Sequence, residues 1–267
     1  MPRIYPKVAK DMFLVQGSWA FGFMEVMLII QFVKIMSSIL SDVKIVSSLF
    51  KESGGVNTYF DSLFIASNIF MLVIGIISAV SVLSHYVSNG VTRKDYFKGT
   101  LIGTLGLAIT IPVAGAIISA VITFIVNLLN IPVNMNPLDG SMNETEGHLI
   151  ADLILSIIFT PYEDPSSSWL LAIFIFAINI FTYYVAGWLI GAAFSRFGIF
   201  GIVSIVLAFV LIYIEDILIS ISLGLPVPSF ITITELPLAF SVIGTFVLIA
   251  IYCWLIRLMT KKIIVKY

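Results

Sequence analysis

The chain has 267 residues, of which 60% are hydrophobic and only 11% are charged. A soluble domain is nearer half apolar and a quarter charged, so this composition excludes an ordinary soluble domain and indicates an integral membrane protein. The net charge is −1, and the single cysteine excludes an internal disulfide and a cysteine-based metal site.

The N-terminal stretch, residues 1–17, is short, basic and amphipathic, a pattern typical of a helix lying in the membrane interface. A cleaved signal peptide is the alternative. However, the apolar run that follows contains Glu25, Gln31 and Lys34, and no small-residue cleavage site comes after it. We therefore expect an interfacial helix over 1–17 and then a retained first span.

Six apolar runs reach the roughly 20 residues that are needed to cross the hydrocarbon core. They cover residues 18–40, 60–83, 100–129, 169–193, 199–221 and 237–256. Residues 149–160 form a further run of about half that length, which favours a re-entrant or interfacial helix. The expected fold is therefore all-α: one polytopic membrane domain over residues 1–267, with six transmembrane helices, an N-terminal amphipathic interfacial helix and short loops.

Lysine and arginine placement orients these spans. The predicted spans leave only Lys34, Lys44 and Lys51 on one side and the other basic residues on the opposite side, while the connection 130–168 carries acids without any lysine or arginine. An excess of basic residues marks the cytoplasmic side. Both termini and the loop 86–99 are thus expected to be cytoplasmic, which requires an even number of spans.

The loop 86–99 is a compact polar stretch between two long apolar runs. Gly90 can end the preceding helix in a left-handed conformation. Thr92 can cap the next helix, and Asp95 three residues on completes a pattern like a capping box. The sequence therefore predicts a short, rigid turn that projects from the cytoplasmic side.

This turn combines positive charge from Arg93, Lys94 and Lys98 with two aromatic side chains, Tyr96 and Phe97. An ordinary positive-inside loop is the simpler interpretation. A loop that only connects two spans needs neither a cap nor two aromatic anchors, so we interpret it as a docking surface for a cytoplasmic partner. The predicted docking residues are Asn89, Gly90, Thr92, Arg93, Lys94, Asp95, Tyr96, Phe97 and Lys98.

Ionisable and amide groups in the first span are further candidates. Such groups are costly in lipid and usually face protein or water. We expect Glu25 to lie deepest, with Gln31 and Lys34 nearer the outer end. They either line a translocation path or form structural hydrogen bonds between helices.

Two adjacent acids, Glu215 and Asp216, follow Arg196 by about 20 residues. Counted along one helix at 1.5 Å per residue, they lie roughly 28 Å from Arg196, near the outer interface. A solvated helix end is one interpretation, and a gate at the external end of a translocation path is the other.

Glycine pairs with small-xxx-small spacing occur at 99–103 and at 187–191, and each predicts close helix packing, within the chain or between two chains. The phosphate-binding G-x-x-x-x-G-K-[ST] motif is missing, as are H-E-x-x-H and G-x-S-x-G. We therefore expect neither an enzyme nor a chain that binds ATP, a metal or nucleic acid itself.

The sequence Asn-Gly-Val-Thr-Arg-Lys at 89–94, with the six spans, closely resembles the permease subunits of ABC-2-type exporters of Gram-positive bacteria. In that family the first cytoplasmic loop is a coupling helix that docks on a separate ATPase. The resemblance implies two ATPase subunits that hold ATP and Mg²⁺, a second permease chain (identical or a paralogue), and a bacterial cell membrane. The run at 149–160 departs from the family, which places outer re-entrant helices between the fifth and sixth spans.

Within the family, the sequence looks like the staphylococcal permeases that export phenol-soluble modulins, which are amphipathic toxin peptides. The expected function is thus ATP-driven export of amphipathic peptides by alternating access. A lantibiotic-immunity or multidrug efflux permease is one alternative. A membrane scaffold or sensor without transport is another, and an adjacent ATPase gene would argue against it.

Overall fold

A computed structural model describes residues 4–39, 57–131, 165, 168–225, 227 and 236–261. These residues fold into helices, without a strand among them. In chain order the elements are α1 (Tyr5–Ile39), α3 (Tyr59–Ile77), the π-helical turn η1 (Ser78–Val82), α4 (Leu83–Ser88), α5 (Arg93–Leu128), α7 (Trp169–Phe197), the 3-10 turn η2 (Gly198–Gly201), α8 (Ile202–Leu223) and α9 (Leu238–Thr260). The predicted re-entrant run 149–160 lies outside the described residues.

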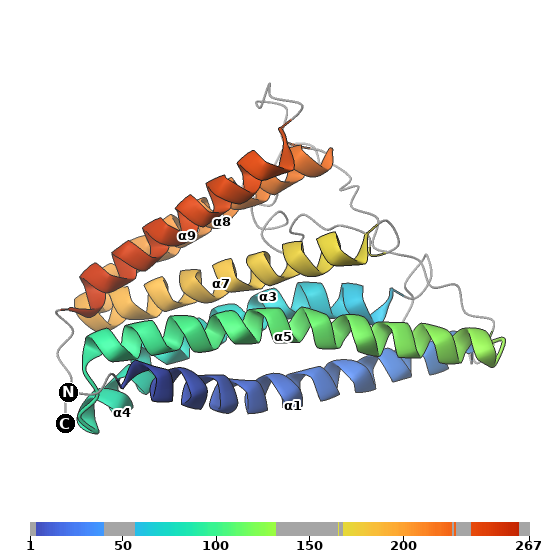
Figure 1. The fold of residues 1–267 in the computed structure, drawn as a ribbon, viewed down its shortest axis with the longest axis horizontal. Helices are drawn as coiled ribbons and strands as arrows, with labels where there is room; N and C mark the ends of the chain where they lie inside the picture. Colours follow the sequence, from blue (N-terminus) through green and yellow to red (C-terminus); the bar gives the residue numbers. More distant parts are fainter. Residues whose placement is uncertain are drawn as a thin grey trace.

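Five helical stretches in the described part of the chain are long and apolar enough to cross a membrane. This confirms the all-helical prediction, and the helices are compatible with a transmembrane protein. The longest stretch, Trp169–Leu223, contains both α7 and α8, which are joined by η2. The chain turns back on itself there, with Gly198 at φ 59°, so that α7 and α8 run in opposite directions (Figure 1).

The predicted interfacial helix is not confirmed as a separate element, because α1 continues without a break past residue 17. Its 35 residues span about 50 Å, more than the roughly 30 Å of a hydrocarbon core. Val8 and Met12 are buried, and they lie against Gly99 and Gly103 of α5. The apolar face that we expected to enter the lipid therefore packs on another helix of the same chain.

Helices α3 and α7 approach each other most closely through glycine. A Cβ added at Gly187 would collide with the backbone of Leu72, and one added at Gly191 would lie 2.7 Å from the carbonyl oxygen of Ile76. Gly103 packs against α1 in the same way, because a Cβ added at Gly103 would lie 2.6 Å from the carbonyl oxygen of Ala9. Both small-xxx-small motifs thus serve packing within the chain.

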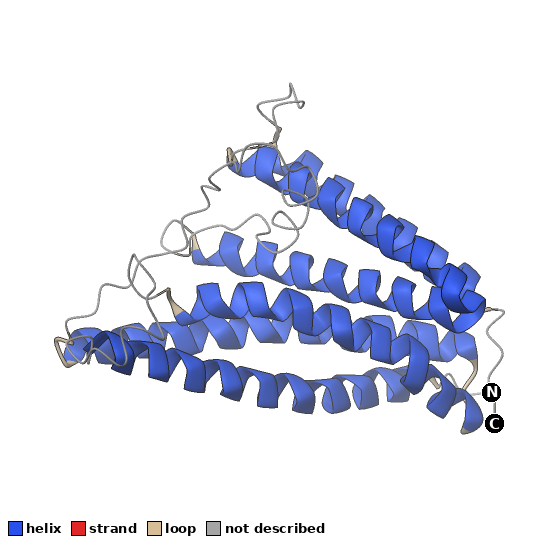
Figure 2. Ribbon diagram, turned by 180° about the vertical axis from the view of Figure 1, so that it is seen from behind, coloured by secondary structure: helices blue, strands red, loops and turns tan. Residues whose placement is uncertain are grey.

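Helix α4 and the start of α5 lie at the same end of the bundle as the ends of α7 and α9 (Figure 1), and Figure 2 shows the bundle from behind. Basic residues of the sequence gather at this end. We call this the basic end. Its lysines and arginines among the described residues are Lys7, Lys10, Arg93, Lys94, Lys98, Arg196, Arg257 and Lys261. Helices α8 and α9 form a hairpin that meets the other helices at the basic end and diverges from them toward the opposite end (Figure 1).

The glycine contact between α3 and α7 gives a first testable prediction. Gly187→Ala should lower the free energy of unfolding in detergent by about 1–3 kcal/mol, because its methyl group overfills a packed contact. Gly22→Ala is the matched control, since a Cβ there meets nothing within 4 Å and alanine favours the helix. Equal midpoints of thermal unfolding for the two variants would show that the helices do not depend on this approach.

Candidate functional site

The turn at the basic end is closed on both sides by hydrogen bonds. Gly90 follows the end of α4 and has a φ of 82°. The N–H of Gly90 donates to the carbonyl of Val87, and the N–H of Val91 donates to the carbonyl of Tyr86. These two hydrogen bonds form a Schellman motif. Thr92 caps α5, because its hydroxyl oxygen accepts the N–H of Asp95 at 3.1 Å. The predicted left-handed glycine and threonine cap are both confirmed.

We predicted that the aromatic residues of the turn face outward, and the structure shows that they face inward. Tyr96 and Phe97 are buried, 1% and 8% exposed, and both rings pack on Trp188 of α7. Tyr96 also donates a hydrogen bond of 2.6 Å to the carbonyl of Ser78. Sequence alone could not give this direction, because both faces of an apolar membrane helix can be buried. Tyr96 and Phe97 therefore brace the turn and cannot serve as docking anchors.

The remaining predicted docking residues surround that buried pair. The exposed ones are Asn89, Gly90, Thr92, Lys94 and Lys98, whereas Arg93 and Asp95 are half-buried. Arg93 donates to the carbonyl of Lys261 at 2.7 Å, which ties the turn to the end of α9. The surface that this turn presents is therefore positive and polar.

A buried hydrogen-bond network sits directly beneath the turn. The side-chain amide of Gln16 in α1 donates to the hydroxyl of Ser78 at 2.9 Å and to that of Tyr184 at 3.3 Å, and it accepts from Thr104 at 3.2 Å. The network thus joins α1, the π-helical turn η1, α5 and α7. A single amide within an apolar run was the sequence signal for it, and our sequence reading did not use it.

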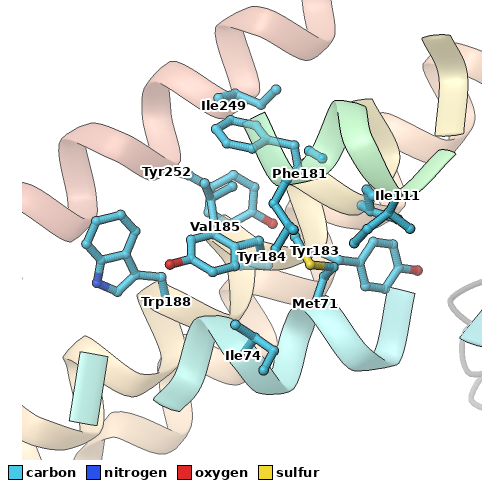
Figure 3. Close-up of a cluster of buried hydrophobic side chains, with 14 of the residues drawn as sticks. Met71, Ile74, Ile111, Phe181, Tyr183, Tyr184, Val185, Trp188, Ile249 and Tyr252 are labelled. Atoms are coloured by element: carbon cyan, nitrogen blue, oxygen red, sulfur yellow. The ribbon is translucent and has the colours of Figure 1, made fainter. Parts of the chain in front are cut away.

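Tyr184 belongs to the central aromatic packing. Figure 3 shows that α7 places its aromatic side chains between α3 on one side and α9 on the other. The labelled residues are Met71, Ile74, Ile111, Phe181, Tyr183, Tyr184, Val185, Trp188, Ile249 and Tyr252.

The two adjacent acids lie inside the bundle, which corrects their predicted place at a solvated helix end. Glu215 is 0% exposed and Asp216 is 5% exposed. Our count from Arg196 ran through η2, where the chain reverses. Counted from Gly201, Glu215 lies about 20 Å along α8, inside a hydrocarbon core of roughly 30 Å.

These acids have few hydrogen-bond partners among the described residues. One oxygen of Glu215 accepts from the hydroxyl of Thr182 on α7 at 3.1 Å. The other oxygen of Glu215 and both oxygens of Asp216 accept no hydrogen bond there. Buried ionisable groups at membrane depth are functional candidates by default.

The candidates in α1 are not brought together with these acids. Glu25 is exposed and lies beside Met24, whose carbonyl accepts from Tyr59 at the start of α3. Gln31 is buried and donates to the carbonyl of Asn57 at 2.9 Å, and Lys34 is half-buried one turn further on. Glu25 is thus exposed on the outside of this chain's bundle, and a path lined by it would lie outside that bundle.

The Gln16 network predicts that removal of its central amide lowers the stability of the chain. Gln16→Leu should destabilise the chain by about 1–2 kcal/mol, because three buried partners lose a hydrogen bond without access to water. Thr110→Val is the control, since that exposed hydroxyl bonds only within its own helix. Thermal unfolding in detergent measures both, and an unchanged midpoint for Gln16→Leu would contradict the role of the network.

Comparisons of the chain with protein-family models, with curated proteins and with solved structures find no match.

Proposed function

We propose that this chain is the membrane-spanning permease subunit of an ATP-driven exporter of the ABC-2 type. It holds no nucleotide itself, and two copies of a separate cytoplasmic ATPase bind ATP and Mg²⁺. Two permease chains, identical or paralogous, complete the transporter in a bacterial cell membrane. Six crossings with both termini in the cytoplasm follow if α7 and α8 each cross once.

The rigid turn at the basic end is the observation that carries this proposal. A Schellman motif and a threonine cap close its backbone, and the Tyr96 hydroxyl fixes it to η1. A turn that is stiff in itself and fixed to the helices below can transmit a displacement that a flexible loop would absorb. This is the mechanical property that a coupling helix requires.

The contacts of the turn give the route of that displacement. Tyr86 of α4 donates to the carboxylate of Asp11 on α1, and Arg93 reaches the end of α9. Trp188 packs on both buried aromatic rings, which links the turn to α7. Closure of two ATPase subunits would therefore move the basic ends of these helices together and rock the two permease chains between inward-open and outward-open forms.

The exposed surface of the helices favours an amphiphilic substrate. Large apolar side chains such as Phe21, Phe124 and Phe246 are more than half exposed. A polar solute would lose its hydration on such surfaces without gaining partners, which is costly. An amphipathic peptide can leave its apolar face on these helices or in lipid, and we propose such peptides as the exported class.

The topology can be tested by cysteine labelling in a Cys253→Ser background. Ser141→Cys, which lies outside the described residues, should react with an impermeant thiol reagent added to intact cells. Ser88→Cys, exposed at the basic end, should react only after the cells are opened, because basic loops stay in the cytoplasm. Labelling of position 88 in intact cells would reverse the proposed orientation.

The docking role can be tested by charge reversal. The double substitution Lys94→Glu and Lys98→Glu should reduce the amount of ATPase that co-purifies in mild detergent by about tenfold, since rim charges steer association. Amphipathic peptides should also stimulate ATP hydrolysis less in this variant than in the wild-type complex, while the midpoint of thermal unfolding stays the same.

The matched control is the double substitution Lys7→Glu and Lys10→Glu. These two lysines are also exposed at the basic end but lie on α1, outside the turn, and they give the same change in net charge. Equal loss of ATPase in both variants would mean that only the overall charge matters. Normal capture by the Lys94 and Lys98 variant would refute docking at the turn.

A further inference from the structure

We propose that the buried acids of α8 form a binding site for a primary ammonium group of the substrate, such as a lysine side chain or the N-terminal amine of an amphipathic peptide. The site consists of Glu215 and Asp216 with side chains from α7 and α9, and we call it the carboxyl cluster. The inference deepens the proposed function, on which the peptide nature of the ligand rests.

Helix α7 contributes one face to the carboxyl cluster. Thr182 donates to Glu215, and Tyr183 lies within electrostatic range of both acids. Asn179 lies three residues before Thr182 and four before Tyr183, so all three side chains share one face of α7. Asn179 is 1% exposed, and neither its amide nitrogen nor its oxygen has a hydrogen-bond partner among the described residues.

Helix α9 covers the cluster from the other side. Tyr252 is fully buried, lies within electrostatic range of both acids and donates to the carbonyl of Ala208 at 2.6 Å. Nearer the opposite end, the hydroxyl of Ser241 donates to the carbonyl of Leu218 at 2.6 Å. These two contacts set the antiparallel register of α8 and α9 and keep the acids between α7 and α9.

The chemistry of the cluster matches an ammonium group. Three carboxyl oxygens and the oxygen of Asn179 accept no hydrogen bond from the described residues, whereas an ammonium group offers three donors and no acceptor. An anion would be repelled by an ionised carboxylate, and a neutral sugar offers no positive charge to pair with one.

Access to the cluster requires movement of the α8–α9 hairpin. The hairpin joins α7 at the basic end through η2, where Gly198 has a left-handed φ of 59° and provides a short pivot. The hairpin already diverges from the other helices toward the opposite end (Figure 1). The acids lie about 20 Å from that pivot, so a modest rotation would separate them from α7.

The test compares two forms of one helical peptide of leucine and lysine. One form has free amines, and in the other every amine is acetylated. Binding is measured on the full-length chain in nanodiscs of zwitterionic lipid, with empty nanodiscs subtracted. Wild-type chain should bind the free-amine form at least about tenfold more tightly, because each charge pair formed away from water is strong.

The double variant Glu215→Gln and Asp216→Asn should lose this preference while its midpoint of thermal unfolding does not fall, because acids with so few partners contribute little to folding. Thr110→Val, exposed on α5, should keep the preference. Equal binding of the two peptides by the wild-type chain would overturn the site, as would a double variant that still prefers free amines. If the two acids serve only to exchange protons, the wild-type chain should bind the two peptides equally.

A separate measurement distinguishes failure of this site from failure of the proposed function. In the complex with its ATPase, both peptide forms are tested for stimulation of ATP hydrolysis. Equal stimulation by the two forms supports export and rejects the ammonium site. Selective binding without any stimulation supports the site and rejects peptide export.

Discussion

The side-chain amide of Gln16 is the interaction on which the arrangement of the helices depends. In hydrocarbon no water can replace a lost partner, so a polar group holds helices together only when its hydrogen bonds are made within the protein. Gln16 makes three, to Ser78, Tyr184 and Thr104. Four segments of the chain are therefore fixed at one level, close to the basic end, and the cytoplasmic turn rests on them.

The Gln16 network and the carboxyl cluster are both buried, but they differ in how many of their polar atoms have hydrogen-bond partners. This difference bears on their function. The Gln16 network is satisfied, which suits a fixed structural joint. Glu215 and Asp216 are about as fully buried as Gln16 but keep three carboxyl oxygens without hydrogen bonds in the described part of the chain. A protein tolerates such a cost where a ligand or a second conformation supplies the missing partner. Rigidity at the basic end and incomplete pairing further along α8 fit a transporter that turns about one end.

The sequence predicted where the helices lie better than what each side chain faces. Hydropathy placed most ends of the apolar runs within a few residues of the helix ends, although α1 and α5 begin well before their runs. The chemistry of Gly90 and Thr92 predicted the turn, because it depends on neighbours along the chain. Tyr96 was assigned outward and lies inward, since an apolar membrane helix lacks the polar face that shows direction. The depth of Glu215 was wrong because the helical rise was counted from Arg196, which precedes η2, although α8 begins only at Ile202.

Glycine spacing links these observations to the mechanism. Where Gly187 and Gly191 let α7 approach the backbone of α3, the two helices have little freedom to separate without losing packed contacts. Helix α8 is instead joined to α7 by the hydrogen bond from Thr182 to Glu215, with η2 as its covalent link. The contact between α7 and the α8–α9 hairpin can therefore open with less loss of close packing than the contact between α3 and α7. The unpaired acids lie at that contact.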